Sequence, residues 1–429
     1  MTTLVVRGGR VLRPGGAVTE ADVRIDVEDG TILAIGPDLE GDRSLDASDG
    51  LVMPGLVNGH CHVAMTLLRG YADDKPLEAW LQEDIWPVEA ALTPDDVEAG
   101  ATLGILEMIR GGVTAFADMY FHVDAVADAV ERSGVRAVLG HGVIGVGKDE
   151  SAAREDAREG LAVAERLDGR AEGRISTAFM PHSLTTVPAW LYEEFVPQAR
   201  SAGLPVHIHA NETRDEVVPI RDEHGVDPLV YAADLGLCEP EDWLAHAVHC
   251  TEAEIEVLAD SGCGVVHCPA SNMKLASGMA PVQALLDAGV TVGVGTDGAA
   301  SNNDLSMFDE LRDAAMVGKL AAGDAGAVPA GAAVSMATAG SAAAIGLEAG
   351  RLEVGAPADL AVVDLSAPHL TPVHDIESLL TYAASAADVR HTVCDGQILM
   401  EERTVRTLDA SAVRERAVDQ ATSLLDRAN

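Results

Sequence analysis

The chain has 429 residues, and because 69 are acidic and 29 are basic its formal net charge at pH 7 is -40. This charge excludes nucleic-acid backbones and anionic membranes as natural partners. Hydrophobic residues make up 48% of the chain, which excludes a disordered acidic protein and allows a large buried core.

Cysteine use and the N-terminal residues predict a cytoplasmic protein. Six cysteines are too few for a disulfide framework in a chain of this length. The first residues, MTTLVVRGGRV, lack the basic, apolar and small-residue regions of a secretory signal. Acidic residues exceed basic ones along almost the whole chain, which is typical of a halophilic surface whose self-repulsion is screened by concentrated salt.

The two ends of the chain share one sequence texture. Residues 1–53 alternate short apolar runs with Gly and Asp turns, which predicts a small antiparallel β unit. The same pattern returns near the other end, in DLAVVDL and VRHTVCDGQILM. We therefore expect residues 1–53 and 354–429 to form one small β domain beside a central domain of residues 54–353.

Apolar, β-rich runs separated by helix-period segments fill the central domain. There are eight such runs: LVMPGLVNGHCH, VTAFADM, RAVLGHGVI, ISTAFMPHS, PVHIHA, WLAHAVH, CGVVHCP and TVGVGTDG. Eight strands alternating with helices predict an α/β fold of the (β/α)8 TIM-like barrel type. Functional groups of such barrels lie where the strands end, so the polar residues at those positions carry the functional argument.

Three of these strands end in potential metal ligands. His60 and His62 are two residues apart on the first strand and so share a face. A pair of histidines on one strand makes structural hydrogen bonds about as often as it binds a metal ion. His209 at the end of the fifth strand and Asp297 at the end of the eighth complete a set that suits one divalent ion such as zinc.

With these residues in place, the chain resembles the amidohydrolase superfamily. Within it, the chain is similar to 5-methylthioadenosine/S-adenosylhomocysteine deaminases and to relatives that act on 5'-deoxyadenosine. The resemblance spans nearly the whole chain, and five segments carry it: PGLVNGHCHVAMTLLRGYADDKPLEAWLQEDIWPVEA (54–90), HIHANET, AHAVH, HCPASNMKLASGMAPV and GTDGAASNN.

The resemblance implies hydrolytic deamination of an adenosine derivative, which yields the inosine analogue and ammonia. It makes His60, His62, His209 and Asp297 the ligands of one divalent ion, usually zinc in the family. Water bound to such an ion loses a proton near neutral pH and attacks an electron-poor ring carbon once the ring nitrogen is protonated. Glu212 is implied to protonate the ring, while His246 and Asp297 handle the proton of the water and the departing ammonia.

The resemblance also implies residues that hold the substrate. Trp80 and Glu89 occupy positions where residues of family members pack on the nucleoside and bind the ribose hydroxyls. Trp80 fits the buried face of an amphipathic helix equally well. His182 stands at the end of the fourth strand, where a binuclear relative would carry a bridging lysine. This position predicts one metal ion and a contact between His182 and the substrate base.

One position departs from the family pattern. Members that bind S-adenosylhomocysteine place an arginine at the end of the third strand, and this chain has His141 there. An imidazole binds a carboxylate more weakly than a guanidinium does, and Arg154 is the candidate to compensate. We therefore expect the chain to prefer small, uncharged 5' groups over the homocysteine tail.

Two other functions compete with nucleoside deamination. The first is an aminohydrolase of the same metal shell that acts on a free base or a triazine, and Trp80 and Glu89 argue against it because they suit a ribose. The second is a barrel that lost catalysis and serves as a scaffold, which the complete ligand set opposes. The expected partners are a small nucleoside and further copies of the chain in a homo-oligomer, with neither nucleic acid nor membrane.

Overall fold

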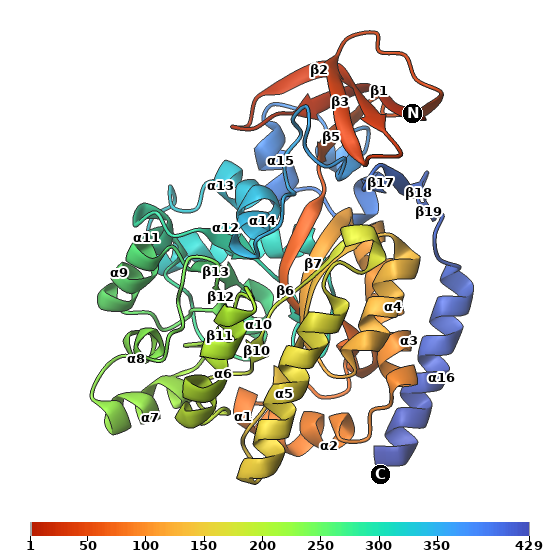
Figure 1. Ribbon diagram of the computed structural model, residues 1–429. Coiled ribbons are helices and arrows are strands. Elements are labelled where there is room, and N and C mark those ends of the chain that lie inside the picture. Colours follow the sequence, from red (N-terminus) through yellow and green to blue (C-terminus); the bar gives the residue numbers. More distant parts are fainter. Residues whose placement is uncertain (1, 429) are drawn as a thin grey trace.

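Both chain ends contribute strands to one nine-stranded sheet, which lies at one end of the molecule (Figure 1). The computed structural model describes residues 2–428. The sheet runs in the order β19-β18-β17-β16-β5-β1-β2-β3, with β4 paired to β1. N-terminal and C-terminal strands meet where β5 pairs antiparallel with β16. The bounds are β1 Thr3–Leu12, β2 Val18–Asp26, β3 Thr31–Gly36, β4 Arg43–Asp46, β5 Gly50–Pro54, β16 Leu360–Asp364, β17 Val389–Cys394, β18 Gln397–Glu401 and β19 Thr404–Val405.

The central part of the chain contains parallel strands in two sheets. Their orders are β10-β8-β7-β6-β15, with β9 paired to β8, and β11-β12-β13-β14. Every one of the eight predicted apolar runs contains at least one of these strands. Their residues are almost all buried, as expected of parallel strands covered on both faces. The bounds are β6 Leu56–His62, β7 Val113–Tyr120, β8 Arg136–Val143, β9 Ile175–Thr177, β10 Met180–Pro181, β11 His207–Ala210, β12 Trp243–His246, β13 Gly264–His267, β14 Val292–Val294 and β15 Asp297–Gly298.

Helices connect these strands and cover them from outside (Figure 1). α3 shows why they begin where they do: Thr93 and Asp96 form a reciprocal capping box, and Pro94 occupies the first turn. Thr251 and Glu254 cap α9 in the same way. The connecting helices are α3 Pro94–Arg110, α4 Val123–Ser133, α5 Glu150–Leu167, α6 Ala189–Ser201, α7 Arg214–His224, α8 Pro228–Asp234, α9 Glu252–Ser261, α10 Pro269–Lys274, α11 Val282–Asp287 and α12 Met307–Ala322, with a 3-10 turn at η3 Ala171–Gly173.

The segment after β6 is a chain of short, irregular helices. It comprises η1 Val63–Leu68, α1 Leu77–Trp80, the π-helical turn η2 Leu81–Ile85 and α2 Trp86–Glu89. Lys274 on α10 holds its beginning by an ion pair with Asp73 at 2.5 Å. π-helical turns are uncommon and occur frequently at functional sites.

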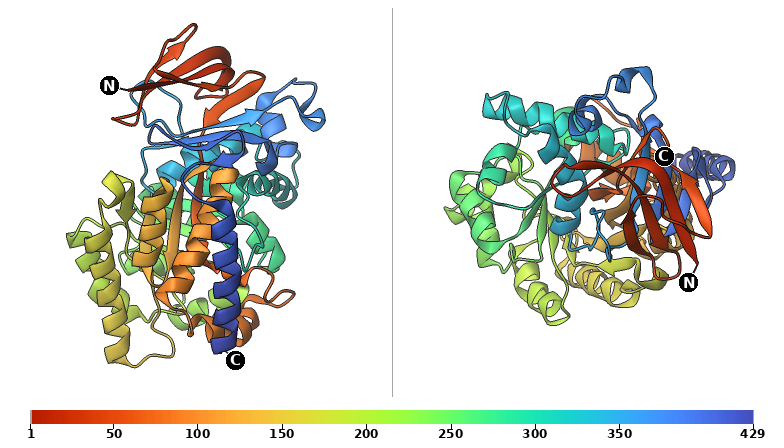
Figure 2. Two further views of the ribbon diagram at one scale, coloured as in Figure 1. Left: turned by 90° about the vertical axis from the view of Figure 1, so that its right-hand side faces the viewer. Right: turned by 90° about the horizontal axis from the view of Figure 1, so that it is seen from above.

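The C-terminal residues divide between the two parts of the molecule. η4 Met336–Gly340 and α14 Ser341–Ala344 pack against the parallel strands β6 and β14, and α13 Ala330–Ser335 and α15 Ile376–Tyr382 pack against each other and against α12. Two 3-10 turns, η5 Pro368–Leu370 and η6 Ala386–Asp388, lie between β16 and β17 along the chain. The last helix, α16 Ala410–Ala428, instead runs along α3, and Arg427 forms an ion pair with Asp96 there (Figure 2). Residues 410–428 therefore lie against the central part, although we expected the small β domain to include them. The boundaries at residues 53 and 354 stay predictions.

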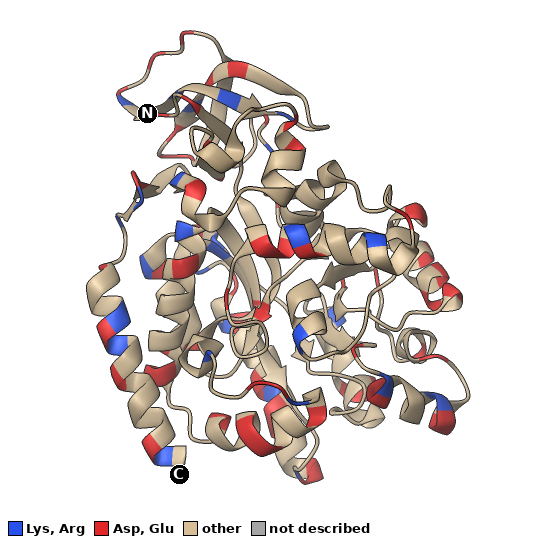
Figure 3. Cartoon of the chain, turned by 180° about the vertical axis from the view of Figure 1, so that it is seen from behind, with Lys and Arg blue, Asp and Glu red and all other residues tan. Residues whose placement is uncertain are grey.

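The surface matches the composition. Seen from behind, acidic residues are spread over many helices and loops rather than gathered in one element (Figure 3). Within residues 2–428, no helix combines the length and the apolar character that crossing a membrane requires.

Candidate metal centre and active site

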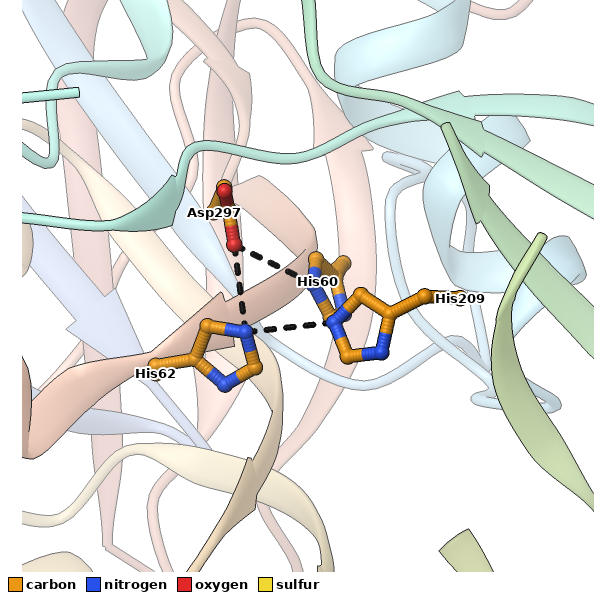
Figure 4. A group of neighbouring side chains, drawn as sticks. All are labelled: His60, His62, His209 and Asp297. Carbon is orange, nitrogen blue, oxygen red and sulfur yellow. Dashed lines mark hydrogen bonds and ion pairs between the residues drawn. The ribbon is translucent and has the colours of Figure 1, made fainter. Parts of the chain in front are cut away.

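Four predicted ligands meet at the ends of β6, β11 and β15 (Figure 4). His60, His62, His209 and Asp297 each offer one ligand atom, and these atoms all lie within 4.8 Å of one another. His62 Nε2 lies 3.1 Å from Asp297 Oδ1 and 3.2 Å from His209 Nε2. Residues 2–428 contain no second group of this kind.

Hydrogen bonds from the outer ring nitrogens orient the three histidines. His62 Nδ1 donates to the carbonyl of Met119 at 2.7 Å, and His209 Nδ1 donates to the carbonyl of His182 at 2.9 Å. Because each Nδ1 carries the proton, each Nε2 presents a lone pair to the centre of the group. Orientation of this kind is usual for histidines that bind metals.

His207 orients the third ligand. Its Nδ1 donates to the carbonyl of Trp243, so its Nε2 accepts from His60 Nδ1 at 2.9 Å. The remaining atom, His60 Nε2, is buried and has no hydrogen-bond partner among the described residues. A buried nitrogen without a partner, facing a carboxylate and two further imidazoles, fits a divalent cation. His207 is thus a buried, hydrogen-bonded histidine that positions a ligand.

The carboxylate is fixed by the strand-end loops. Ser271 and Ser301 both donate to Asp297 Oδ2, at 2.7 and 2.6 Å. Oδ1 is thereby left facing the histidines. Both serines lie in segments that carry the family resemblance, but their spacing in the sequence does not predict their hydrogen bonds to Asp297.

Glu212 and His246 lie together beside the metal group. Glu212 Oε2 is 3.6 Å from His246 Nε2, and Ser277 donates to Glu212 Oε1 at 3.4 Å. His246 Nδ1 donates to Asn272 Oδ1 at 2.9 Å, which turns Nε2 toward Glu212. Burial raises the pKa of Glu212, so the carboxyl keeps a proton at a higher pH than an exposed glutamate does.

One cavity of about 1050 Å³ joins these groups to the predicted substrate residues. Trp80, Glu89, His182, Glu212 and His246 all line it, together with His62, His209 and Asp297. Trp80 is buried, and its indole Nε1 donates to the carbonyl of Ala72 at 3.0 Å. It is thus both a packed core residue and part of the cavity wall. Burial lowers the pKa of His182 to about 3, so this ring is neutral.

The structure supplies a partner for Glu89 that the sequence did not indicate. The Tyr120 hydroxyl, at the end of β7, donates to Glu89 Oε1 at 2.8 Å. Burial raises the pKa of Glu89 to about 7, against the opposing effect of this hydrogen bond. The last residue of a strand in this fold faces the functional end, and that position is the only sequence signal for Tyr120.

His141 and Arg154 do not join this group. His141 Nε2 lies 3.0 Å from Asp156, whose other oxygen binds Lys148, and the ring does not line the cavity. Arg154 pairs with Glu150 and Glu194 and stacks over Trp190, also away from the cavity. Ion pairs with carboxylates on α5 and α6 hold both side chains in place. The preference for uncharged 5' groups stays a prediction.

Comparisons with known proteins agree with this centre. The model of the Amidohydrolase family matches residues 51–399. The chain belongs to the amidohydrolase family. This amidohydrolase is 63% identical over 430 residues to a 5-methylthioadenosine/S-adenosylhomocysteine deaminase from Haloarcula marismortui, covering 100% of both chains. It is 45% identical over 405 residues to a 5'-deoxyadenosine deaminase from Methanosarcina mazei, covering 94% of each.

A solved structure is similar to this amidohydrolase over its whole length. It is an adenosine deaminase from Xanthomonas campestris with bound zinc, 39% identical, with a TM-score of 0.94 and coverage of 99% of each chain.

Proposed function

We propose that this amidohydrolase deaminates an adenosine derivative hydrolytically, forming the inosine analogue and ammonia. One observation carries the proposal: the metal group, the Glu212–His246 pair and Glu89 line a single cavity. The deaminase relatives named above support the same reaction.

The ligand set supports one divalent ion, and we infer that it is zinc, as in the related structure. When bound, such an ion lowers the pKa of a coordinated water and so makes a nucleophile available near neutral pH. Around it, the residues of the chain supply the proton transfers. The raised pKa of Glu212 suits a carboxyl that protonates the ring nitrogen. His246 Nε2, 3.6 Å from Glu212, is placed to transfer the proton that leaves with ammonia.

We infer that three residues hold the nucleoside. Glu89 in its ionised form accepts hydrogen bonds from the two ribose hydroxyls, oriented by Tyr120. Trp80 packs on the nucleoside through the edge of its ring that faces the cavity. His182 is neutral and lines the cavity next to the metal group, where it contacts the base.

We also propose that the two parallel sheets are arcs of one (β/α)8 barrel. Isolated parallel bridges support this closure, because Phe179 pairs with Val206 and Ser183 pairs with His209 between the edges of the two sheets. β14 leads within two residues into β15, which pairs with β6. The homo-oligomer and the cytoplasmic location stay predictions.

An ammonia-release panel tests the function. The purified zinc-loaded enzyme is offered adenosine, 5'-deoxyadenosine, 5-methylthioadenosine, S-adenosylhomocysteine, guanine, 8-oxoguanine, cytosine and an amino-triazine. We expect release from the adenosine derivatives only. Faster release from a free base or the triazine would favour the competing aminohydrolase, and no release from any compound would favour the scaffold.

A further inference from the structure

Glu254 on α9 is a completely buried glutamate that does not line the active-site cavity. Its Oε2 accepts from the backbone amide of Thr251 at 2.8 Å, which belongs to the capping box of α9. Its Oε1 takes no part in the cap and accepts from Asn211 Nδ2 at 2.8 Å and from the backbone amide of Leu229 at 3.0 Å. Burial of a carboxylate is costly unless hydrogen bonds satisfy it, and the cap accounts for only one of the two oxygens.

The capping box of α3 shows that capping does not require a second contact of this kind. Asp96 Oδ2 accepts from the backbone amide of Thr93 at 2.8 Å, whereas Asp96 Oδ1 is buried and has no hydrogen-bond partner among the described residues. The bond between Glu254 and Asn211 joins residues 43 positions apart. It is therefore a tertiary contact that the cap of α9 does not explain.

Asn211 occupies the bend between a metal ligand and the proposed proton donor. β11 ends at Ala210, one residue after the ligand His209, and Glu212 follows Asn211 directly. Asn211 has a φ of 53°, in the left-handed region that asparagine adopts more readily than most residues. Because this bend leads straight into Glu212, a change in the conformation of Asn211 moves the backbone of Glu212.

The side chain of Asn211 depends on Glu254 for its position. It is almost completely buried, its Oδ1 has no hydrogen-bond partner within residues 2–428, and its other side-chain contact is a long one of 3.9 Å to Cys250 Sγ. Glu254 is in turn fixed by backbone amides at the starts of α8 and α9, from Leu229 and Thr251. Two helix starts thus hold the bend before Glu212.

We propose that Glu254 is a positioning residue for Glu212 and acts through Asn211. The proposal rests on the proposed function, in which Glu212 protonates the substrate ring. A proton donor must lie within hydrogen-bond reach of its acceptor, so a small displacement of Glu212 slows the proton transfer. The zinc ligand His209 is oriented separately, by the carbonyl of His182, and the residues proposed to hold the nucleoside lie on other elements.

Four variants test the contact in the zinc-loaded enzyme. Glu254→Gln keeps the size of the side chain, but an amide cannot accept hydrogen bonds at both ends. Asn211→Gly removes the side chain and still permits the left-handed conformation. The double variant combines the two changes. Thr251→Ala is the matched control, because it removes the capping hydroxyl of the same helix and keeps the bond between Glu254 and Asn211.

The measurements are kcat and KM for 5'-deoxyadenosine, the zinc content and the melting temperature. Glu254→Gln and Asn211→Gly should each lower kcat by about tenfold, while KM and the bound zinc stay those of the wild type. The double variant should lose about tenfold as well, rather than roughly a hundredfold, because both changes break one contact. Thr251→Ala should lower the melting temperature, as lost N-caps do, and keep the wild-type kcat.

Several results would overturn the proposal. Wild-type kcat in Glu254→Gln or in Asn211→Gly is one, and a roughly hundredfold loss in the double variant is another, because the two residues would then act independently. An equal loss of kcat in Thr251→Ala, or a loss explained by missing zinc or raised KM, would assign Glu254 a merely structural role. If Glu254→Gln does not fold, the kcat of Asn211→Gly compared with that of Thr251→Ala decides. The proposed function fails separately, if the wild type releases ammonia from none of the adenosine derivatives.

Discussion

At the scale of single residues, the proposed mechanism makes turnover depend on Glu212. It is buried beside His246, contacts no metal ligand by hydrogen bond, and has a raised pKa. Glu212→Gln should therefore retain about one equivalent of zinc per chain and lose about a hundredfold or more in kcat. Metal analysis and ammonia release measure both properties. Asp297→Ala, which removes a ligand, is the contrasting variant and should lose the metal; near-normal turnover of Glu212→Gln would contradict the role.

If Glu89 binds the ribose as proposed, substrate binding should depend on pH. Because its pKa is raised to about 7, the carboxyl gains the charge that attracts ribose hydroxyls only as the pH rises through that value. We expect KM for 5'-deoxyadenosine to fall several-fold as the pH rises from about one unit below this pKa to about one unit above it. Tyr120→Phe removes a hydrogen bond that lowers this pKa, so the fall should move to higher pH.

Glu89→Gln provides the check on that assignment, since an amide does not titrate and should remove this fall in KM.

The same group has a predictable effect on stability. Between its ordinary pKa of 4.5 and about 7 the folded state holds a proton that the unfolded chain has released. The contribution of Glu89 to stability therefore falls as the pH rises through that window and is constant above it.

At the scale of elements, the first turn of α7 positions the proton donor. Thr213 is the N-cap and accepts from the backbone amide of Glu216 at 3.3 Å, while Glu216 Oε2 accepts from the backbone amide of Glu212 at 2.8 Å. Thr213→Ala should cost about 1 kcal/mol of stability, as lost N-caps do. It should also lower kcat by about tenfold, because the Glu212 backbone is held less firmly.

A matched variant separates the two effects. Asp149 caps α5 by accepting from the amide of Ala152 at 2.9 Å, and it does not line the cavity. Asp149→Ala should lose similar stability in thermal unfolding but keep the wild-type kcat. If both variants lower kcat equally, then α7 has no special part in positioning Glu212.

At the scale of the whole molecule, the net charge of -40 predicts a requirement for salt. Acidic residues are spread over many elements of the chain, as Figure 3 shows for one side, and their repulsion acts across the molecule until counterions screen it, within roughly 3 Å at molar ionic strength. We expect the melting temperature to be several degrees higher in molar KCl than in dilute buffer. Sucrose is the control, since it favours the compact state without screening charge. Equal melting temperatures in both salt conditions would contradict the expectation.

The sequence by itself determined which residues form the candidate metal group. His60, His62, His209 and Asp297 could be found because each one ends or adjoins an apolar strand, and parallel strands bring their carboxyl ends together. The family resemblance implied the proton-transfer roles of Glu212 and His246, which stay predictions, and the structure brings the two side chains together. The meeting of the two chain ends in one sheet was likewise predictable, because both ends repeat one short-strand pattern.

Only the tertiary structure decided which side chains contact one another across the ends of the strands. Tyr120 at the end of β7 donates to Glu89 on α2, and His207 binds His60, which lies 147 positions earlier in the sequence. His141 is paired with Asp156 on α5. Such pairs depend on how helices and strands pack, and local patterns carry no information about packing between distant segments.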